Sequence, residues 1–189
     1  MWLSVVPMLC ASTRSVYVTG FGPFGDVAEN PSCRLVRQLA SVHVLDSEIE
    51  VCTTSVDEAV CRHFDVIKKA CHSSRPVVLH YGVDCEATAI TIEICARNYV
   101  HVEDGGSEIL LGGPASIETT YDLNQVLPQL PELFCASSDA GDYLCNYMYY
   151  KSLVALNKVA DVLFIHVPTF DVIPETVQLE GLNLLVSLL

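Results

Sequence analysis

Short apolar runs alternate along this chain with segments of helical periodicity, and no other sequence feature constrains the fold as strongly. Such alternation is typical of a layered α/β domain, in which helices cover a central sheet. The predicted strands are 15–19, a part of 44–54, 76–81, 87–96 (a strand, or a strand that leads into a turn), 133–136 and 161–167. Helices are predicted over 30–40, 56–67, 122–130, from the turn at 138–141 to about 157, and from 174 onward. The glycine-rich stretch 101–114 is expected to be a mobile loop.

Length and composition suit one domain of ordinary size. The chain has 189 residues, of which 51% are apolar, and no repeat or low-complexity linker divides it. We expect residues 1–14 to be an N-terminal extension that need not be ordered, and residues 15–189 to be a single α/β domain. The apolar stretch 2–11 is a weak secretory signal, because it contains Pro7 and no basic residue precedes it. No run approaches the roughly 18 apolar residues of a membrane span.

Charge and cysteine content exclude several classes of partner. Acidic side chains outnumber basic ones by 23 to 10, which gives a formal net charge of −13. Nucleic acids and anionic membranes are usually met by basic patches, so neither is expected as a partner. The nine cysteines are an odd number and include no C-x-x-C pair, which argues against a zinc or redox site. Most lie in apolar runs, where a free thiol behaves as a small hydrophobe. This favours a reducing compartment, and we expect a cytoplasmic protein.

The loop Gly20–Gly25 follows the first predicted strand and fits the pattern G-x-G-x-x-G. Together with Asp46 near the end of the second strand, it satisfies a dinucleotide-binding fingerprint. In that fingerprint the helix opens within the motif, whereas here the helix start signal, Asn30-Pro31, comes five residues after the last glycine. Two other interpretations stay open. The loop is either a tight turn whose aromatic residues pack into the core, or a ligand pocket with Phe21 and Phe24 as its wall.

Three residues could carry out chemistry together. Cys145 lies near the start of a predicted helix, where the helix dipole favours a thiolate, although eight other cysteines compete with it and a helical cysteine is more often simply buried. His166 ends an apolar strand, so it either bonds to nearby backbone or points into a cleft. Glu93 lies among β-branched apolar residues, where an unpaired carboxylate is costly, and a histidine would suit it as a partner. The competing histidine, His80, is expected to be structural.

Four segments, in order, resemble a known family, pyroglutamyl-peptidase I (pyrrolidone-carboxylate peptidase). The segments are V-T-G-F-G-P-F-G at 18–25 with N-P-S at 30–32, H-Y-G-V at 80–83 with I-T-I-E at 90–93 and N at 98, S-D-A-G-D-Y-L-C-N-Y-M-Y-Y-K-S-L at 138–153, and F-I-H-V-P at 164–168. Members of this family are cysteine exopeptidases that release pyroglutamate from blocked peptide N-termini. The segments span almost the whole chain, and the stretch around Cys145 is specific.

The resemblance implies a fold, a set of site residues and a substrate class. The fold is a single three-layer α/β/α sandwich with a mixed central sheet. The implied catalytic triad is Glu93, Cys145 and His166, and the implied pocket residues are Phe21 and Phe24 as aromatic walls, with Tyr143 and Leu144 beside them. Small peptides with an N-terminal pyroglutamate are the implied substrates, and no metal or other cofactor is implied.

This chain departs from the family's pattern in three places. Thr54-Ser55-Val56 replaces a leucine-proline-valine stretch ahead of the second helix, the loop after Asn98 differs, and the C-terminus is short. These segments contribute to the pocket rim and to assembly, so substrate range and oligomeric state stay open. The alternative to an active peptidase is a catalytically inactive homologue that binds pyroglutamyl peptides and leaves them intact.

Overall fold

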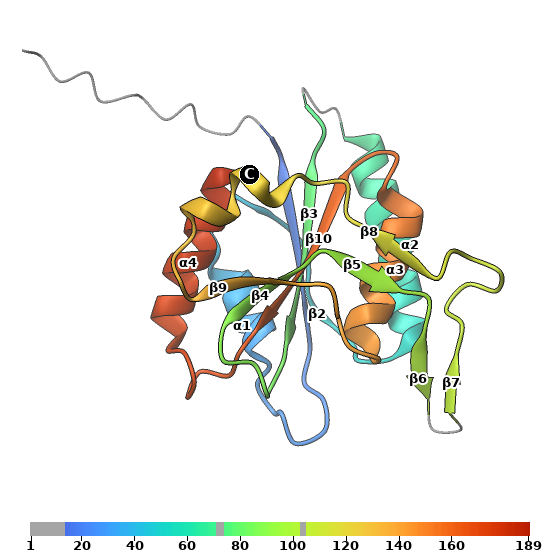
Figure 1. Ribbon diagram of the computed structural model, residues 1–189, viewed down its shortest axis with the longest axis horizontal. Helices are drawn as coiled ribbons and strands as arrows, with labels where there is room; N and C mark the ends of the chain where they lie inside the picture. The colour runs from blue at the N-terminus through green and yellow to red at the C-terminus, as the bar shows by residue number, and fades with distance from the viewer. Residues whose placement is uncertain (1–13, 71–73, 103–104) are drawn as a thin grey trace, which may run out of the picture.

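A six-stranded mixed sheet forms the centre of the molecule (Figure 1). The computed structural model describes residues 14–70, 74–102 and 105–189, so the predicted extension over 1–14 lies almost wholly outside the described residues. The strand order is β2-β1-β3-β10-β4-β9. β4 runs antiparallel to β10, and the other neighbouring strands are parallel. The strands are β1 (Val16–Phe21), β2 (His43–Ile49), β3 (Val77–Val83), β4 (Ile90–Glu93), β9 (Phe134–Ser137) and β10 (Asp161–Val167).

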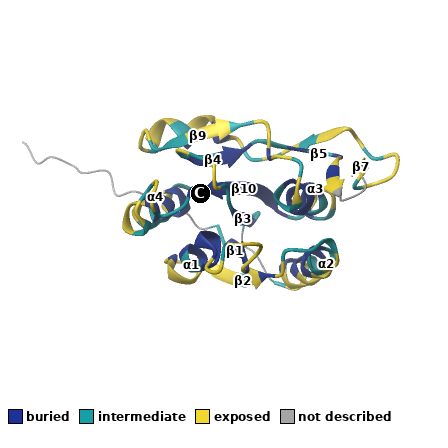
Figure 2. Ribbon diagram, turned by 90° about the horizontal axis from the view of Figure 1, so that it is seen from below, coloured by how far each residue is buried: buried dark blue, intermediate teal, exposed yellow. Residues whose placement is uncertain are grey.

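Two pairs of helices cover the two faces of this sheet (Figure 2). The helices α1 (Pro31–Gln38) and α4 (Glu175–Leu188) lie on one face, and α2 (Thr53–Lys69) and α3 (Leu144–Leu156) lie on the other. Successive side chains of a strand point to opposite faces, so Val16 and Val18 of β1 pack with α1 and α4, whereas Tyr17 packs with α2 and α3. The predicted three-layer α/β/α sandwich with a mixed sheet is confirmed.

The sequence signals for the central strands and for α1 hold in the structure. β3 and β10 are buried along nearly their whole length, as a continuous apolar run predicts for a strand covered on both faces. At the start of α1, the side chain of Asn30 accepts a hydrogen bond of 3.0 Å from the backbone N–H of Ser32, and Pro31 occupies the first turn. The predicted cap therefore forms, and it fixes where the β1–α1 loop must end.

The segment after β4 differs from its prediction. Instead of one loop over 101–114, β6 (Val100–Val102) pairs with β7 (Gly105–Ser107), and β5 (Cys95–Arg97) pairs with β8 (Ser116–Glu118). The Asn98 side chain donates to the carbonyl of Leu110 and accepts from its N–H, both at 2.8 Å, which fastens the base of this hairpin. The helix predicted over 122–130 is two 3₁₀ turns, η1 (Leu123–Gln125) and η2 (Leu127–Gln129), because Pro128 has no N–H to continue an α-helix. Among the described helices, none is long and apolar enough to cross a membrane.

Two histidines are buried between α2 and the sheet. His63 of α2 and His80 of β3 are stacked with their ring centroids 6.3 Å apart. Neither ring nitrogen of His63 has a hydrogen-bond partner among the described residues. His80 is held by a contact of 2.7 Å between its Nδ1 and the Thr19 hydroxyl, which supports the structural role predicted for it. Burial lowers the pKa of His63 to about 4, and burial lowers the pKa of His80 well below its ordinary value.

We expect acid to destabilise the protein through His63. Because the folded pKa is depressed from 6.5 to about 4, the unfolded chain binds the proton more tightly, and stability is lost as pH falls from about 6.5 towards 4. The cost approaches roughly 3 kcal/mol at the acid end. His63→Leu should reduce the difference between the free energies of unfolding measured in urea at neutral pH and near pH 4.5. His43→Leu, at an exposed histidine, is the matched control; an equal reduction in both variants would contradict this assignment.

Candidate active site

A pocket of about 730 Å³ opens where the carboxyl ends of three parallel strands meet. In α/β sheets this edge is the usual place for ligands. β1 contributes Phe21, β3 contributes Val83 and β10 contributes His166, while the segment leading into α3 forms another wall. The complete lining is Phe21, Phe24, Asn30, Val51, Val83, Asp84, Cys85, Glu86, Asp139, Ala140, Gly141, Asp142, Tyr143, Leu144, Cys145 and His166. A smaller hollow of about 290 Å³ lies elsewhere, around Arg14 and Asp161.

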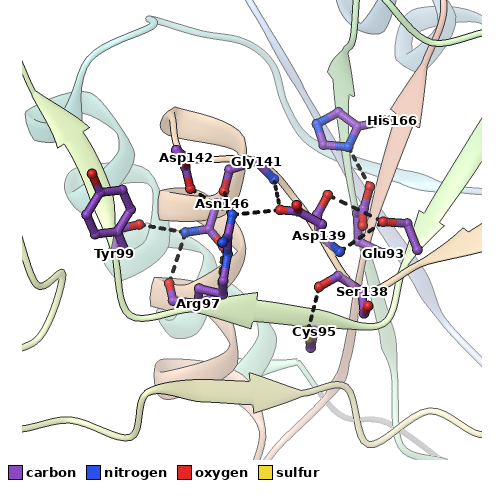
Figure 3. A network of polar contacts seen from close by, with 11 residues as sticks. Glu93, Cys95, Arg97, Tyr99, Ser138, Asp139, Gly141, Asp142, Asn146 and His166 are labelled. Atoms are coloured by element: carbon purple, nitrogen blue, oxygen red, sulfur yellow. Dashed lines mark hydrogen bonds and ion pairs between the residues drawn. The ribbon is translucent and has the colours of Figure 1, made fainter. Parts of the chain in front are cut away.

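His166 is paired with Glu93 behind the pocket (Figure 3). The antiparallel register places Glu93 of β4 opposite Phe164 of β10, and His166 follows two residues later on the same face of β10. His166 Nδ1 lies 2.8 Å from Glu93 Oε1, with both side chains buried at 9% and 2% exposure. The other oxygen, Glu93 Oε2, has no hydrogen-bond partner among the described residues. Glu93 is thus committed to the histidine, as the cost of a buried carboxylate predicts.

Cys145 lies in the first turn of α3, beside the same histidine. Burial alone would lower the pKa of His166, but the charge of Cys145 and hydrogen bonds to Cys145 and Glu93 outweigh it and raise this pKa to about 10. The histidine is therefore held as an imidazolium between two acidic groups at neutral pH. A cysteine beside an imidazolium at a helix N-terminus is the arrangement that favours a reactive thiolate.

Gly82 of β3 makes room for the sulfur of Cys145. A Cβ added at Gly82 would lie 2.8 Å from Cys145 Sγ and 2.8 Å from Cζ of Phe164, closer than such atoms approach one another. The side chain of Phe164 is fully buried, so it has little freedom to move away. The motif H-Y-G-V thus needs its glycine for the position of the thiol.

Gly82→Ala should displace the thiol and strain the core. We expect kcat/KM to fall about 100-fold or more, because a displacement of about 1 Å at a reacting group has an effect of that size. The free energy of unfolding should also fall by about 1–3 kcal/mol through overpacking. Steady-state kinetics and urea unfolding measure the two effects, and a variant with unchanged kinetics would show that Gly82 does not limit the thiol's position.

The four residues expected to bind substrate all line this pocket. Phe21 is buried and packs against Phe164 with ring centroids 6.4 Å apart, whereas Phe24 is 37% exposed and Tyr143 is 66% exposed. Leu144 is half-buried directly before Cys145. Phe21 ends β1 and Phe24 lies on the β1–α1 loop, which Asn30 anchors by donating to the carbonyl of Gly22 at 2.9 Å. Six of the seven predicted site residues therefore line one cavity, and the seventh, Glu93, stands behind His166.

Gly20, near the end of β1, serves close packing. A Cβ at Gly20 would lie 2.9 Å from the carbonyl oxygen of Ser32 in α1, so the strand and the helix approach too closely for any side chain there. Helix α1 begins only at Pro31, beyond the glycine pattern, and Asp46 pairs with Arg62 at 3.1 Å. Both observations disfavour the dinucleotide interpretation.

The sequence alone did not reveal a polar network beside the pocket (Figure 3). Its members are Arg97 of β5, Asp139 and Asp142 in the segment before α3, and Asn146, which follows Cys145. The two acidic residues stand in the motif S-D-A-G-D, and their spacing before the cysteine is a signal that could have marked them. Arg97 lies far from them in sequence and has no comparable signal.

Comparison with known proteins decides the family. A family model described as pyroglutamyl peptidase matches residues 14–183. The chain belongs to the pyroglutamyl peptidase family. The sequence prediction of this family, and with it of a cysteine-type peptidase, is thereby confirmed.

Relatives of known name cover most of the chain. Pyroglutamyl-peptidase 1 of Rattus norvegicus is 32% identical over 168 residues, which are 82% of this chain and 79% of the rat protein. The Homo sapiens protein of the same name gives the same figures. The crystal structure of pyrrolidone carboxyl peptidase from Thermus thermophilus superposes with a TM-score of 0.74 at 26% identity, covering 92% of this chain and 100% of the other. Pyroglutamyl peptidase I from Bacillus amyloliquefaciens superposes with a TM-score of 0.77 at 20% identity, covering 93% and 96%, which supports the fold alone.

Proposed function

We propose that this member of the pyroglutamyl peptidase family is a cysteine exopeptidase that releases N-terminal pyroglutamate from peptides through a thioester acyl-enzyme. Cys145 is the nucleophile, His166 is the general base and acid, and Glu93 orients the histidine. One observation carries the proposal. The buried pair of Glu93 and His166 faces a cysteine at the start of a helix, at a pocket that is also lined by Phe21 at the end of β1 and Phe24 on the following loop. The comparisons with named relatives support the choice of substrate.

Acylation begins with a proton on His166 and a thiolate on Cys145. The thiolate attacks the carbonyl carbon of the pyroglutamyl residue, and a tetrahedral oxyanion forms. The first backbone N–H groups of α3 have no partner within the helix, and the side chain of the N-cap residue, Tyr143, does not bond to them. They are suited to hold the oxyanion, an effect worth roughly 3 kcal/mol per donor. His166 then gives its proton to the leaving amine, and the thioester remains.

Deacylation uses the same groups in reverse. Neutral His166 takes a proton from a water molecule, which attacks the thioester, and the thiolate leaves as the imidazolium forms again. Glu93 holds Nδ1 so that Nε2 is the nitrogen that exchanges protons, and its charge stabilises the imidazolium. The buried, otherwise unpaired carboxylate is therefore used in both halves of the reaction.

The shape of the pocket suits a small neutral lactam. Phe21 and Phe24 offer apolar surface for the ring, and the segment that leads to Cys145 lines the same pocket. Four carboxylates also line the pocket, those of Asp84, Glu86, Asp139 and Asp142. Glu86 and Asp139 are exposed, whereas Asp84 and Asp142 are half-buried, and Arg97 pairs with Asp139 and Asp142. The apolar surface of Phe21 and Phe24 favours a blocked, neutral amino terminus.

We also propose that the protein works in the cytoplasm. In the described part of the chain, seven cysteines are free thiols. A thiol nucleophile among so many free thiols needs a reducing compartment. We expect small peptides as the only partners needed for activity, with neither nucleic acid nor membrane required.

Hydrolysis of fluorogenic amides tests the proposal. Under reducing conditions, purified protein should release the fluorophore from a pyroglutamyl amide and leave the glutamyl and prolyl amides intact. Product analysis of a peptide that begins with pyroglutamate, beside the same peptide with glutamine in that place, should show cleavage of the first alone. A folded protein that binds the pyroglutamyl peptide and leaves it intact would instead be the inactive homologue.

A further inference from the structure

One guanidinium group fastens the segment that precedes the cysteine. Arg97 Nη2 donates to Asp139 Oδ1 at 2.7 Å and to Asp142 Oδ1 at 2.7 Å, and it lies 3.4 Å from the carbonyl oxygen of Gly141 (Figure 3). Asp139 Oδ1 also accepts from the N–H of Gly141 at 3.1 Å. Gly141 has a φ of 80°, in the left-handed region, so the chain turns sharply between the two carboxylates. The turn is thus held from one side by Arg97.

The same strand region also holds the first turn of α3. The side chain of Asn146 is fully buried, accepts from the N–H of Arg97 at 2.8 Å and donates to the carbonyls of Arg97 and Tyr99 at 2.9 and 2.7 Å. In addition, the N–H of His101 donates to the carbonyl of Asp142 at 2.6 Å. Cys145 lies between these anchors, immediately before Asn146. The region 97–101 therefore fixes the backbone on both sides of the nucleophile.

These ion pairs are poorly placed to stabilise the fold. The side chains of Arg97, Asp139 and Asp142 are 42%, 68% and 46% exposed. Exposed ion pairs contribute little to stability, because water screens them and long side chains lose freedom in forming them. Two carboxylates on one guanidinium do, however, define a geometry. All residues from 139 to 145 line the pocket, so that geometry is the shape of one pocket wall.

We infer that Arg97 is a positioning residue for the reaction, which holds the segment 139–144, and with it Cys145 and the first N–H groups of α3, in the geometry of the transition state. The inference rests on the proposed function of the pocket. The two aromatic walls expected for the ring of the substrate, Phe21 and Phe24, belong to a separate segment, the end of β1 and the β1–α1 loop, which Asn30 and Ser32 anchor without Arg97. Loss of Arg97 should therefore lower kcat far more than it raises KM.

The test compares Arg97→Ala with Arg62→Ala. Arg62 is also exposed and ion-paired, to Asp46 at 3.1 Å, but it lies on α2 outside the pocket lining. We expect Arg97→Ala to lower kcat about 30-fold with KM changed less than about threefold, while Arg62→Ala stays near the wild type. Thermal midpoints of both variants should remain close to that of the wild type. Arg97→Lys should keep part of the kcat that Arg97→Ala loses. Guanidinium chloride at about 50 mM should raise the kcat of Arg97→Ala about fivefold and leave the other variants unchanged, with NaCl as the salt control.

A second arm separates positioning from general damage. If Arg97 acts by holding the two carboxylates, adding Arg97→Ala to Asp139→Asn/Asp142→Asn should lower kcat less than about threefold further. The inference would be overturned if the effects of these substitutions on kcat multiplied. It would also be overturned if the kcat of Arg97→Ala lay within twofold of that of Arg62→Ala, or if its loss of kcat accompanied a lowered thermal midpoint and was not rescued by guanidinium.

The alkylation rate of Cys145 makes the inference testable apart from turnover. Without Arg97, the segment that places Cys145 beside His166 is held less firmly, and a thiol that is less well placed against the imidazolium reacts more slowly. Iodoacetamide labelling at neutral pH, mapped to Cys145 by mass spectrometry, should therefore slow about fivefold in Arg97→Ala relative to Arg62→Ala. A wild-type protein that is inert towards pyroglutamyl amides would refute the proposed function. An unchanged alkylation rate in Arg97→Ala would instead refute the positioning role of Arg97.

Discussion

Replacing Cys145 with alanine should lower kcat/KM for a pyroglutamyl amide by about 10⁴-fold or more, to the limit of detection. The sulfur forms the bond on which the whole mechanism depends, and no other side chain lies in its position. The thiol is only half-buried and alanine removes a single atom, so the variant should fold. Steady-state kinetics with the fluorogenic amide, together with circular dichroism of the same samples, measures both properties.

The matched control for this variant is Cys85→Ala. Cys85 lines the same pocket and is an exposed free thiol, but it lies on the loop after β3 and not at a helix start beside His166. We expect Cys85→Ala to keep kcat/KM within about threefold of the wild type. If instead both variants were inactive, or Cys145→Ala retained activity, the nucleophile would have been assigned wrongly.

The second large effect is expected at Glu93. Glu93→Gln keeps the size of the side chain but removes the charge that stabilises the imidazolium, and it allows an amide NH₂ to face Nδ1 and impose the wrong tautomer. We expect kcat to fall about 10³-fold. KM should change little, because Glu93 does not line the pocket. Glu86→Gln, a neutralised carboxyl that does line the pocket, is the matched control and should remain within a few-fold of the wild type.

The pH dependence of the same two variants adds a sharper criterion. The charge of Cys145 and the bonds to Cys145 and Glu93 outweigh burial and raise the pKa of His166 to about 10, so the wild-type imidazolium persists through neutral pH and is lost as pH rises through that value. Removing the charge of Glu93 should move the alkaline decline of kcat to lower pH, while Glu86→Gln leaves it in place. If kcat of Glu93→Gln declined at the same alkaline pH as that of the wild type, the carboxylate would not act through the histidine.

Much of the fold follows from local pattern. β3 and β10 are continuous apolar runs that only a doubly covered strand can bury, and Asn30-Pro31 marks the start of α1 in the sequence as it does in the structure. The cost of burying an unpaired carboxylate identified Glu93 as a candidate site residue from the sequence. Its partner, however, is set by the antiparallel register of β4 and β10, which depends on the whole sheet. The resemblance to the family supplied that pairing before the geometry did.

The segment between β4 and α3 was predicted least well. The strands of the β6–β7 hairpin have three residues each and lie around glycines, so they leave no alternation of side chains to detect. The bonds of Arg97 to Asp139 and Asp142 span 42 and 45 residues, and an exposed arginine gives no periodic signal. Such contacts are decided by tertiary structure, where strand β5 is brought beside the start of α3.

Covalent labelling with a pyroglutamyl chloromethyl ketone tests the central claim most directly, because it requires the pocket and the nucleophile at once. The reagent, followed by mass spectrometry of the whole chain and of its peptides, should add about one pyroglutamyl group per chain, on Cys145 alone, with loss of activity in proportion. Excess pyroglutamyl peptide should protect, and the glutamyl analogue of the reagent should label far more slowly. Labelling spread over Cys85 and other exposed thiols, or labelling of Cys145 without preference for the pyroglutamyl group, would contradict the account.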